Sequence, residues 1–395
     1  MRKQTVDALS VRGKKVYVRV DYNVPLDAQG QITDDTRIRA TLPTLQQLLD
    51  GGAALILASH LGRPKGKRNE AYSLAPAAER LAQLLGRPVR LAPDCVGKET
   101  EALAAALQPG DVLLLENVRF HPEEEVNDSA FARALAGLAD VAVNDAFGVS
   151  HRAHASVVGV ARILPMVAGH LVAREIHFLE DTVTRPKRPF VAIIGGAKVS
   201  DKIGVLERLV KIADTLIIGG GMANTFLLAQ GRSVGTSLVE EDARELALRV
   251  LQTAETDGKA VLLPCDVVTA AAFQQTATPH LHAVADVPAD EMILDIGPQS
   301  AQQFAQAIAP AATVLWNGPM GVFEWEAFAD GTKRLAEAVA ANRGISIVGG
   351  GDSVAAMEAC GLADRVTHIS TGGGASLAYL EGQELPGIEC LAEEV

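Results

Sequence analysis

Basic and amide side chains follow several apolar segments in the first part of this 395-residue chain. A guanidinium group binds phosphate or carboxylate through paired hydrogen bonds, so arginines gathered at one edge predict a site for a small, strongly anionic ligand. Taken singly, an arginine is more often solvated surface charge, and a histidine such as His60 is as often structural as ligand-binding. The residues concerned are Asp21, Asn23, Arg37, His60, Arg63, Arg119, Asn144, Asp145, His151, Arg152 and His154.

Glycine clusters end several apolar segments in the second part. Glycine lets backbone N–H groups approach a ligand closely and a helix N-terminus attracts anions, so repeated strand–glycine–helix junctions favour phosphate binding. Lys198 and Lys202 follow the first cluster, placed to neutralise phosphate charge. A merely solvated Lys198 is disfavoured, because the helix dipole repels cations at a helix start. The clusters are Gly195-Gly196, Gly219-Gly220-Gly221, Gly349-Gly350-Gly351 and Gly372-Gly373-Gly374.

Two carboxylates near these clusters have more than one interpretation. Asp352 follows three glycines and precedes a helical segment, so it is predicted either to cap that helix or to hold Mg²⁺ on a nucleotide; the sequence leaves both open. Glu324 lies in a glycine-punctuated loop, where a carboxylate can accept hydrogen bonds from ribose hydroxyls. The sequence contains no G-x-x-x-x-G-K-[ST], no H-R-D or D-F-G, and no G-x-G-x-x-G after its first strand, which excludes P-loop enzymes and protein kinases and weakens a dinucleotide site.

The elements that position these residues alternate between short apolar runs and longer segments of helical spacing. This alternation is typical of a parallel sheet with crossover helices, so the fold class is α/β. Ligands bind beyond the carboxyl ends of the strands in such sheets, where the residues above lie. Predicted helices include 73–86, 202–214 and 332–344. Predicted strands span 15–20, 54–59, 112–117, 141–145, 190–195, 215–220, 260–266, 313–318 and 345–350.

Length and charge limit the remaining possibilities. With 48% hydrophobic and 21% charged residues the chain is typical of a globular protein, and its length predicts about two domains, with a boundary near 183–190 after a helical connection over 167–183. The net charge of -12 argues against nucleic-acid binding. Residues 1–160 hold 19 Lys+Arg and 19 Asp+Glu, so the negative excess lies in the second part.

The cysteines and the apolar runs indicate a cytoplasmic protein. No apolar run reaches the roughly 18 residues needed to cross a bilayer. The cysteines are far apart and form no Cys-x-x-Cys pair, so we expect them to be reduced, buried and structural. They are Cys95, Cys265, Cys360 and Cys390.

Ten different short motifs are distributed over essentially the whole chain. They are VRVDYNVP (18–25), DDTRIRATLPT (34–44), SHLGRPKG (59–66), LLENVRFHPEEE (114–125), VNDAFGVSHRAHAS (143–156), GGAKVSDKI (195–203), GGGMANTF (219–226), LWNGPMGVFEW (315–325), GGGDSVAA (349–356) and STGGGASL (370–377). In this order they resemble the phosphoglycerate kinase family.

The resemblance implies two Rossmann-like domains, each with a mostly parallel sheet flanked by helices, joined by a hinge helix. Residues 1–168 would bind 3-phosphoglycerate or 1,3-bisphosphoglycerate, 169–187 would form the interdomain helix and hinge, 188–380 would bind nucleotide, and 381–395 would pack back toward the N-terminal domain. It also implies a glycolytic ATP:3-phosphoglycerate 1-phosphotransferase, a cytoplasmic monomer that uses Mg²⁺ with ADP or ATP and has no nucleic-acid or membrane partner.

Carried over motif by motif, the resemblance assigns roles to individual residues. The glycerate substrate would contact Asp21, Asn23, Arg37, His60, Arg63, Arg119 and Arg152. The nucleotide would contact Gly196, Ala197, Lys198, Lys202, Gly219, Gly220, Gly221, Asn317, Val322, Glu324, Gly350, Gly351, Asp352 and Ser353, with Asp352 also holding the metal. The transferring phosphoryl group would meet Arg37, Lys198, Gly372 and Gly373. Tyr22, Val149-Ser150 and Ile293 depart from the usual family pattern. None removes a charged contact, and Ile293 is a candidate to reshape the edge of the nucleotide pocket.

The expected mechanism needs no general base, because the acceptor carboxylate, with a pKa of about 4, is ionised at neutral pH. Catalysis is then expected from in-line placement and charge screening, in a cleft that closes by hinge motion and excludes water. Two alternatives belong to other classes. A nicotinamide-dependent oxidoreductase should carry the missing dinucleotide motif, and a hinged anion-binding protein would form no ATP and would usually carry an export signal.

Overall fold

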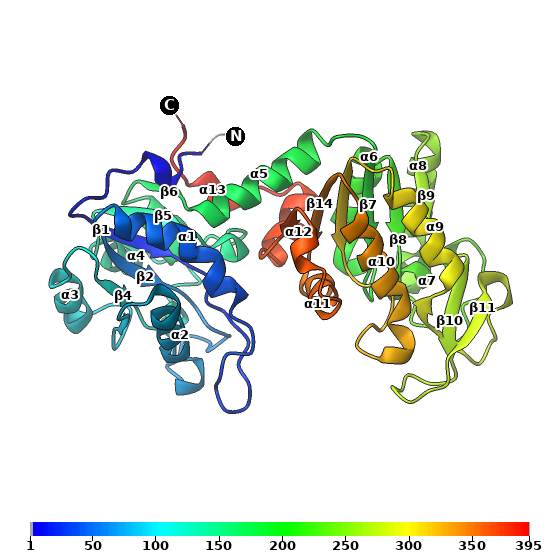
Figure 1. Cartoon of the computed structure of the whole chain (residues 1–395), viewed down its shortest axis with the longest axis horizontal. Helices are drawn as coiled ribbons and strands as arrows, with labels where there is room; N and C mark the ends of the chain where they lie inside the picture. The colour runs from blue at the N-terminus through cyan, green and yellow to red at the C-terminus, as the bar shows by residue number, and fades with distance from the viewer. Residues whose placement is uncertain (1–2, 395) are drawn as a thin grey trace. The chain divides into compact units, whose positions relative to one another are not determined.

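The computed structural model describes residues 3–394, which divide into two units, each built on a sheet flanked by helices (Figure 1). The first unit comprises the residues up to His177 together with those from Glu384 onward, and the second spans Phe178–Gln383. The chain therefore passes between the units twice. The first passage lies within helix α5 (His170–Thr184).

A six-stranded parallel sheet forms the first unit, in the order β3-β4-β2-β1-β5-β6. The strands are β1 (Lys15–Arg19), β2 (Ala54–Ala58), β3 (Arg90–Leu91), β4 (Val112–Leu114), β5 (Val141–Asn144) and β6 (Met166–Ala168). The four strands predicted here are confirmed, and β3 and β6 are short edge strands that were not predicted. The helices are α1 (Thr36–Asp50), α2 (Ala75–Leu85), α3 (Lys98–Ala105), α4 (Ser129–Ala136) and α13 (Pro386–Glu389).

Local chemistry fixes the ends of these helices, and α2 lies within the predicted helix 73–86. Helix α2 has a proline in its first turn, and Gly86, with φ 63°, adopts the left-handed conformation that ends it. Asp128 caps α4 by accepting hydrogen bonds from the backbone N–H groups of Ala130 and Phe131. Strand β2 is buried along its whole length, because helices cover both faces of the sheet.

The second unit contains another six-stranded parallel sheet, in the order β15-β14-β13-β7-β8-β9. Its strands are β7 (Phe190–Ile194), β8 (Thr215–Ile218), β9 (Ala260–Leu262), β13 (Thr313–Asn317), β14 (Ile345–Gly349) and β15 (His368–Ile369). The five strands predicted in this part are confirmed. The helices are α6 (Ile203–Ile212), α7 (Gly220–Ala229), α8 (Arg244–Thr256), α9 (Pro298–Ile308), α10 (Asp330–Ala341), α11 (Gly351–Ala359) and α12 (Gly374–Glu381).

A three-stranded antiparallel sheet, in the order β11-β10-β12, was not predicted. Its strands are β10 (Asp266–Ala270), β11 (His280–Ala283) and β12 (Met292–Ile296). β11 is mostly exposed, so it lacks the apolar run by which the other strands were recognised. In Figure 1, β10 and β11 lie at one side of the second unit.

The C-terminal segment, residues 384–394, packs with the first unit. The backbone N–H of Gly387 donates to the carbonyl of Ser150 at 2.8 Å, and the side-chain amide of Asn144 donates to the carbonyl of Gly387 at 2.9 Å. A Cβ on Gly387 would lie 2.7 Å from the Cα of Ser150, so only glycine fits there. At its far end the segment accepts a hydrogen bond from Gln4 N at Ala392 O, 2.8 Å away.

The prediction that the four cysteines are buried is right only for Cys95. All four are free thiols, but Cys265 is exposed and Cys360 and Cys390 are half-buried. Cys265 lies in the loop before β10, whereas Cys95 is fully buried in the segment before α3.

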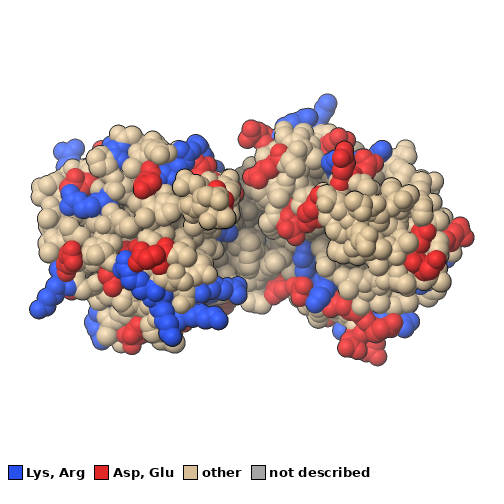
Figure 2. All heavy atoms as spheres, turned by 90° about the horizontal axis from the view of Figure 1, so that it is seen from below, with Lys and Arg blue, Asp and Glu red and all other residues tan. Residues whose placement is uncertain are grey.

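Charge is distributed over the two units as the sequence indicates. On the face shown in Figure 2, Asp and Glu predominate on the second unit, whereas Lys and Arg are prominent on the first. Over residues 3–394, no helix has the length and apolar character that crossing a membrane requires.

Candidate active site

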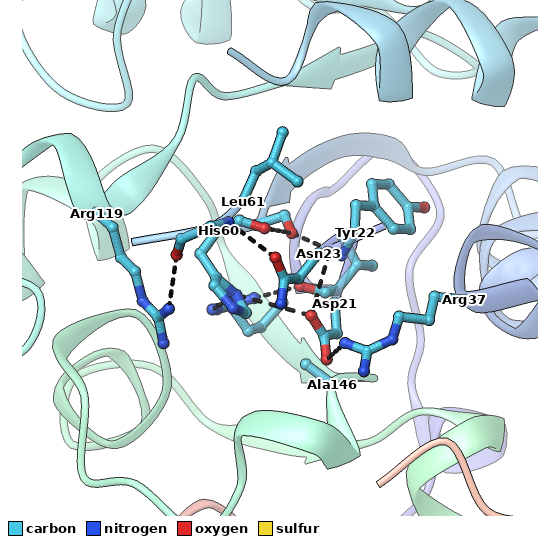
Figure 3. Close-up of polar contacts among 12 residues, drawn as sticks. Asp21, Tyr22, Asn23, Arg37, His60, Leu61, Arg119 and Ala146 are labelled. Carbon is cyan, nitrogen blue, oxygen red and sulfur yellow. Dashed lines mark hydrogen bonds and ion pairs between the residues drawn. The ribbon is translucent and has the colours of Figure 1, made fainter. Parts of the chain in front are cut away.

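The first unit gathers the predicted anion-binding residues at one edge of its sheet. β1 lies between β2 and β5 and all three strands are parallel, so the loops after them meet at the same edge. Asp21 and Asn23 follow β1, His60 follows β2, and Arg119 lies on a short 3-10 helix after β4. The structure therefore brings these sequence-distant side chains together (Figure 3).

Arg37 and Asp21 form an ion pair at this edge. The Arg37 guanidinium, on the second residue of α1, donates to Asp21 Oδ2 at 2.7 Å. Asp21 is buried, whereas the Arg37 side chain keeps 33% of its surface exposed. Asp21 therefore orients a guanidinium that retains unused donors facing solvent, which suits it to bind an incoming anion.

Asn23 and Arg119 together hold the loop after β2. The backbone N–H of Gly62 donates to Asn23 Oδ1 at 2.8 Å, and Arg119 Nη1 donates to the carbonyl of Gly62 at 3.0 Å. Gly62 has φ 62°, and a Cβ there would lie 2.4 Å from the Tyr72 ring. Arg119 Nε is buried without a hydrogen-bond partner, 3.5 Å from Glu125 Oε1. Burial, with the guanidinium of Arg19 nearby, lowers the pKa of Arg119 to about 10.

His60 is held neutral. Burial lowers its pKa well below the usual value, and the charges of Arg19 and Arg119 lower it further. Its Nδ1 lies 3.4 Å from Arg19 Nη2 and 3.7 Å from Asp21 Oδ1, so the ring nitrogen accepts from the guanidinium. A neutral, buried imidazole is suited to hydrogen bonding at neutral pH rather than to adding positive charge.

A buried network behind this edge was missed by the sequence analysis. Arg19, at the end of β1, is fully buried and donates from Nε to Ser156 Oγ at 2.7 Å. That hydroxyl donates to Glu124 Oε1 at 2.6 Å, and His154 Nδ1 lies 3.6 Å from the same oxygen. Burial would raise the pKa of Glu124, but His154 and Arg19 outweigh it and leave the pKa below its usual value. The sequence feature that could have indicated this network is Arg19, an arginine within an otherwise apolar strand.

The remaining predicted residues of this edge differ in exposure. Arg63 is exposed on the loop after β2. Arg152 is half-buried and its Nε lies 3.1 Å from His151 Nε2, while His151 Nδ1 is buried without a hydrogen-bond partner. Burial lowers the pKa of His151, and the Arg152 charge adds to this effect. Arg152 and His151 therefore present basic or donor groups on the loop after β5.

Asp145 does not face this edge, which corrects its expected place among the anion-binding residues. Its Oδ1 accepts hydrogen bonds from the backbone N–H groups of Leu171, at 2.9 Å, and Val172, at 3.4 Å. Thr44 Oγ1 accepts from His170 N at 2.8 Å. These two side chains hold the N-terminus of α5, whose free N–H groups need acceptors. Asp145 Oδ2 is buried without a hydrogen-bond partner.

Asp145 predicts a specific pH dependence of stability. Burial raises its pKa from 3.8 to about 7, so between these values the folded protein keeps a proton that the unfolded chain has released. The free energy of unfolding should then fall by about 1.4 kcal/mol per pH unit as pH rises through this window. Asp145→Asn keeps the acceptor oxygen and removes the titration. In urea titrations we expect the free energy of unfolding to fall by about 3 kcal/mol more for the wild-type protein than for the variant between pH 5 and pH 8.

Asp140→Asn, at an exposed position just before β5, is the control and should leave the wild-type pH slope unchanged. Parallel pH profiles for the wild-type protein and Asp145→Asn would contradict the prediction.

The second unit brings the glycine clusters to the carboxyl ends of adjacent parallel strands. β7, β8, β13, β14 and β15 end side by side, and α7, α11 and α12 begin at Gly220, Gly351 and Gly374. The strand–glycine–helix prediction is thus confirmed for three clusters. The backbones approach closely here: a Cβ on Gly220, with φ 66°, would lie 2.6 Å from the carbonyl oxygen of Gly196. A helix N-terminus offers backbone N–H groups to an anion, but at α7 the N–H groups of Gly220 and Met222 donate to the carbonyls of Met320 and Gly196.

The two lysines after the first cluster differ in environment. Lys198 is exposed. Lys202 Nζ donates to the Gly195 carbonyl at 2.7 Å and to Asn317 Oδ1 at 2.6 Å, and the Asn317 amide donates to the Gly349 carbonyl at 3.0 Å. Burial lowers the pKa of Lys202 to about 8, opposed by the nearby Asp352 carboxylate. The ammonium is therefore held at the ends of β7 and β13, while Lys198 is exposed to solvent.

Asp352 is not the N-terminal cap of α11, so the capping interpretation of this residue is wrong. Gly350, with φ 89°, occupies the cap position, and Asp352 lies exposed in the first turn. Ser353 is buried and its hydroxyl accepts from Gly318 N at 2.5 Å, which fixes the loop after β13. The next junction is similar, with Gly373, at φ 48°, before α12 and Gly372 N donating to Ser370 Oγ.

A pocket of about 320 Å³ opens beside these junctions, within the second unit. Leu238, Phe273 and Ile293 give it an apolar wall, and Glu324 and Asp352 supply carboxylates. Among the predicted residues it is lined by Gly196, Ala197, Gly220, Gly221, Val322 and Glu324. An apolar slot with polar groups at its rim suits a planar base joined to a charged group. Phe273, whose ring packs at a tilt against Trp325 with ring centroids 4.5 Å apart, was not predicted, because an exposed aromatic residue in a loop forms no recognisable pattern.

Comparisons with known proteins agree over the whole chain. A family model described as phosphoglycerate kinase matches residues 6–383. A phosphoglycerate kinase of Moorella thermoacetica is 60% identical over 394 residues, covering 100% of both chains. The solved phosphoglycerate kinase of Coxiella burnetii superposes with a TM-score of 0.89 at 40% identity, covering 98% of each chain. That of Pyrococcus horikoshii gives 0.84 at 32% identity, covering 99% of this chain and 98% of the other.

Proposed function

This chain belongs to the phosphoglycerate kinase family, and we propose that its two polar sheet edges divide the family's reaction between them. The reaction is the glycolytic one: the acyl phosphate of 1,3-bisphosphoglycerate passes reversibly to ADP, giving 3-phosphoglycerate and ATP. The observation that carries the division is the contrast between an arginine-rich edge in one unit and, in the other, a glycine-lined pocket next to Lys202.

The edge of the first unit binds the glycerate substrate in this proposal. Its phosphate and carboxylate groups are bound by guanidinium donors, while neutral His60 supplies a hydrogen bond and Asp21 orients Arg37. Unsatisfied donors such as Arg119 Nε support an anionic ligand here. The full set is Asp21, Asn23, Arg37, His60, Arg63, Arg119 and Arg152.

The pocket of the second unit binds the nucleotide. The base lies against Gly219, Gly220, Gly221 and Val322, Glu324 accepts from the ribose, and the phosphates meet backbone N–H groups and lysines. Lys202 is held by carbonyl and amide oxygens, which a phosphate can replace as partners of the ammonium. The phosphate-binding set is Gly196, Ala197, Lys198, Lys202, Asn317, Gly350, Gly351, Asp352 and Ser353.

Transfer itself requires placement and charge screening rather than proton transfer. The acceptor carboxylate, with a pKa of about 4, is already ionised, and the neutral His60 fits a site without a general base. Arg37, Lys198 and the α12 N-terminus at Gly372-Gly373 screen the oxygens of the moving phosphoryl group. The two ligands occupy different units, so we propose that residues 1–168 and 188–380 act as the two binding domains and that hinge motion around 169–187 brings the reactants together. We place this enzyme in the cytoplasm as a monomer.

Family members use nucleotide substrates, generally with Mg²⁺, and the donor set of this chain fits that ion. Mg²⁺ takes oxygen ligands and is usually bound by one or two carboxylates together with phosphate oxygens and water. Asp352 offers an exposed carboxylate that lines the pocket beside the glycine junctions. Asp352 would hold the ion, which when bound supplies positive charge to the nucleotide phosphates.

Asp352→Asn should raise the Mg²⁺ concentration needed for half-maximal turnover by about 10- to 100-fold, because a hydrogen bond or contact to a charged group is worth about 1.5–3 kcal/mol. The measurement is a Mg²⁺ titration at saturating nucleotide. Glu358→Gln, at the other end of α11, is the matched control and should keep the wild-type titration. An unchanged curve for Asp352→Asn would remove the metal role from this residue.

The proposed function is tested by coupling ATP formation to a spectrophotometric readout, with purified protein, 1,3-bisphosphoglycerate and MgADP. We expect turnover that stops when either reactant is omitted. Absence of ATP formation by folded protein would overturn the assignment. Quenching of NADH fluorescence by the protein would instead favour the oxidoreductase alternative.

A further inference from the structure

Two histidines and a glutamate converge on one face of the small antiparallel sheet. His280 and His282 are two residues apart on the edge strand β11, so their side chains point to the same face. The central strand β10 pairs Thr269 with His280 on one side and with Ile293 on the other. Glu291 precedes Ile293 by two residues and therefore shares that face.

The distances confirm what the register implies. His280 Nδ1 lies 2.7 Å from Glu291 Oε1, and His282 Nε2 lies 3.3 Å from Glu291 Oε2. One donor atom from each of the three residues lies within 4.8 Å of the others. Thr269 donates a short hydrogen bond from its hydroxyl to Glu291 Oε2, which fixes the carboxylate from behind. The side chains of His280, His282 and Glu291 are 46%, 26% and 12% exposed, so an ion can enter from solvent.

A simple imidazole–carboxylate ion-pair network accounts for only part of this arrangement. His280 has a well-formed hydrogen bond to Glu291. His282 Nε2, in contrast, is a buried atom without a hydrogen-bond partner even though a carboxylate oxygen is 3.3 Å away. A ring nitrogen that approaches an anionic oxygen in poor hydrogen-bond geometry is better satisfied by an ion that both groups ligate.

We propose that His280, His282 and Glu291 form a binding site for a divalent first-row transition-metal ion of the zinc type. Two imidazoles and one carboxylate are a common ligand set for Zn²⁺, with water completing the coordination. Imidazole ligands also suit Cu²⁺ and Ni²⁺ but not Mg²⁺, which prefers oxygen. The site is therefore distinct in residues and in ion preference from the nucleotide metal assigned to Asp352.

A second cluster, Asp94, Cys95 and His121 in the first unit, is the weaker candidate. Its donor atoms also lie within 4.8 Å of one another. However, burial raises the pKa of the Cys95 thiol well above its usual value, which disfavours the thiolate that a metal needs, and Asp94 and His121 already form a 2.7 Å hydrogen bond. It serves below as the competing location for any bound metal.

The proposed ion would cross-link the two outer strands of this sheet. β11 pairs with only one neighbour, and Glu291 belongs to the turn before β12, so the ligands join the two outer strands of this sheet across β10. Residues 292–294 of β12 also line the nucleotide pocket. Occupancy should therefore stabilise the wall of that pocket without placing the ion in it.

The test is calorimetric titration of the full chain, freed of metal by dialysis against a chelator, with ZnCl₂ as the only probe. We expect one saturable site, undisturbed by millimolar MgCl₂. Loss of a residue that only orients a metal ligand weakens binding by roughly 10- to 100-fold. The double variant His280→Ala/His282→Ala removes two ligands and should weaken Zn²⁺ binding by more than that. Glu291→Gln should also weaken Zn²⁺ binding. Leu281→Ala changes the residue between the histidines, which points to the opposite face, and should bind Zn²⁺ as the wild-type protein does.

Circular dichroism and phosphoryl-transfer turnover without added zinc should be the same for all these variants, because none touches the catalytic edges. Three results would each overturn the proposal: no saturable Zn²⁺ binding by the wild-type protein, unchanged affinity in the double variant, which would favour the Asp94 cluster, or equal weakening by Leu281→Ala. The kinase assignment is independent of all three.

Discussion

Arg37→Ala is expected to lower kcat by on the order of 10³ to 10⁵, the range measured when an arginine that stabilises a transferring phosphoryl group is removed. KM for 3-phosphoglycerate should change by less than about tenfold, because a loss confined to the transition state appears in kcat rather than in ground-state binding. In the proposed site, Arg63, Arg119 and Arg152 would still hold the substrate. Steady-state kinetics in both directions with the purified variant provide the measurement.

The control for this prediction lies on the same helix. Arg39 pairs with Asp35 at 2.8 Å on an exposed part of α1, so Arg39→Ala removes a guanidinium without touching the Arg37–Asp21 pair. Its kcat should stay within about twofold of the wild-type value, as surface ion pairs contribute little. If Arg37→Ala kept kcat within tenfold and lost only affinity, this arginine would be a ground-state contact and its catalytic role would be wrong.

Glu124→Ala is expected to lower the free energy of unfolding by about 3–5 kcal/mol, because removing one member of a buried ionic network leaves the opposite charge uncompensated. Glu124 is fully buried and linked through Ser156 Oγ to the fully buried Arg19. Alanine would leave that guanidinium and the Ser156 N–H without their anionic partner. Urea denaturation at pH 7, followed by circular dichroism, measures the loss.

Two further variants separate this mechanism from a general packing effect. Glu123→Ala, at the exposed neighbouring position, should change the free energy of unfolding by less than about 0.5 kcal/mol. Arg19→Met/Glu124→Leu removes both charges, and its cost should be clearly smaller than the sum of the losses measured for Arg19→Met alone and Glu124→Leu alone. Additive losses in that cycle would mean that Arg19 and Glu124 are not energetically coupled.

The fold was predictable where burial on both faces produces a continuous apolar run. Strands such as β2 and β7 were recognised because every residue in them is buried, and α2 because its apolar residues recur at helical spacing. The antiparallel sheet was not predictable from the sequence, because β11 is mostly exposed and its pairing depends on residues distant in the sequence. The direction of a polar side chain was equally hidden: Asp145 follows a strand as Asp21 does, but it faces the N-terminus of α5, which only the tertiary packing supplies.

The candidate site was predictable as residue types at strand ends, not as geometry. The sequence placed Asp21 and Arg37 at one edge, but not their ion pair. The sequence placed Asp352 after three glycines, but the cap position of α11 is occupied by Gly350, because the φ of 89° there favours glycine. Arg19 escaped notice because an arginine within a strand fits an exposed edge as well as a buried network, and only tertiary neighbours decide between them.

The return of residues 384–394 to the first unit has a consequence for biosynthesis. Gly387 is hydrogen-bonded to Ser150, directly before His151 and Arg152, so the loop after β5 is held by residues translated more than 230 positions later. A nascent chain on the ribosome can therefore complete the sheet of the second unit before the residues that pack onto the first unit have been made. Loss of residues 384–394 would impair the unit whose sheet is encoded first.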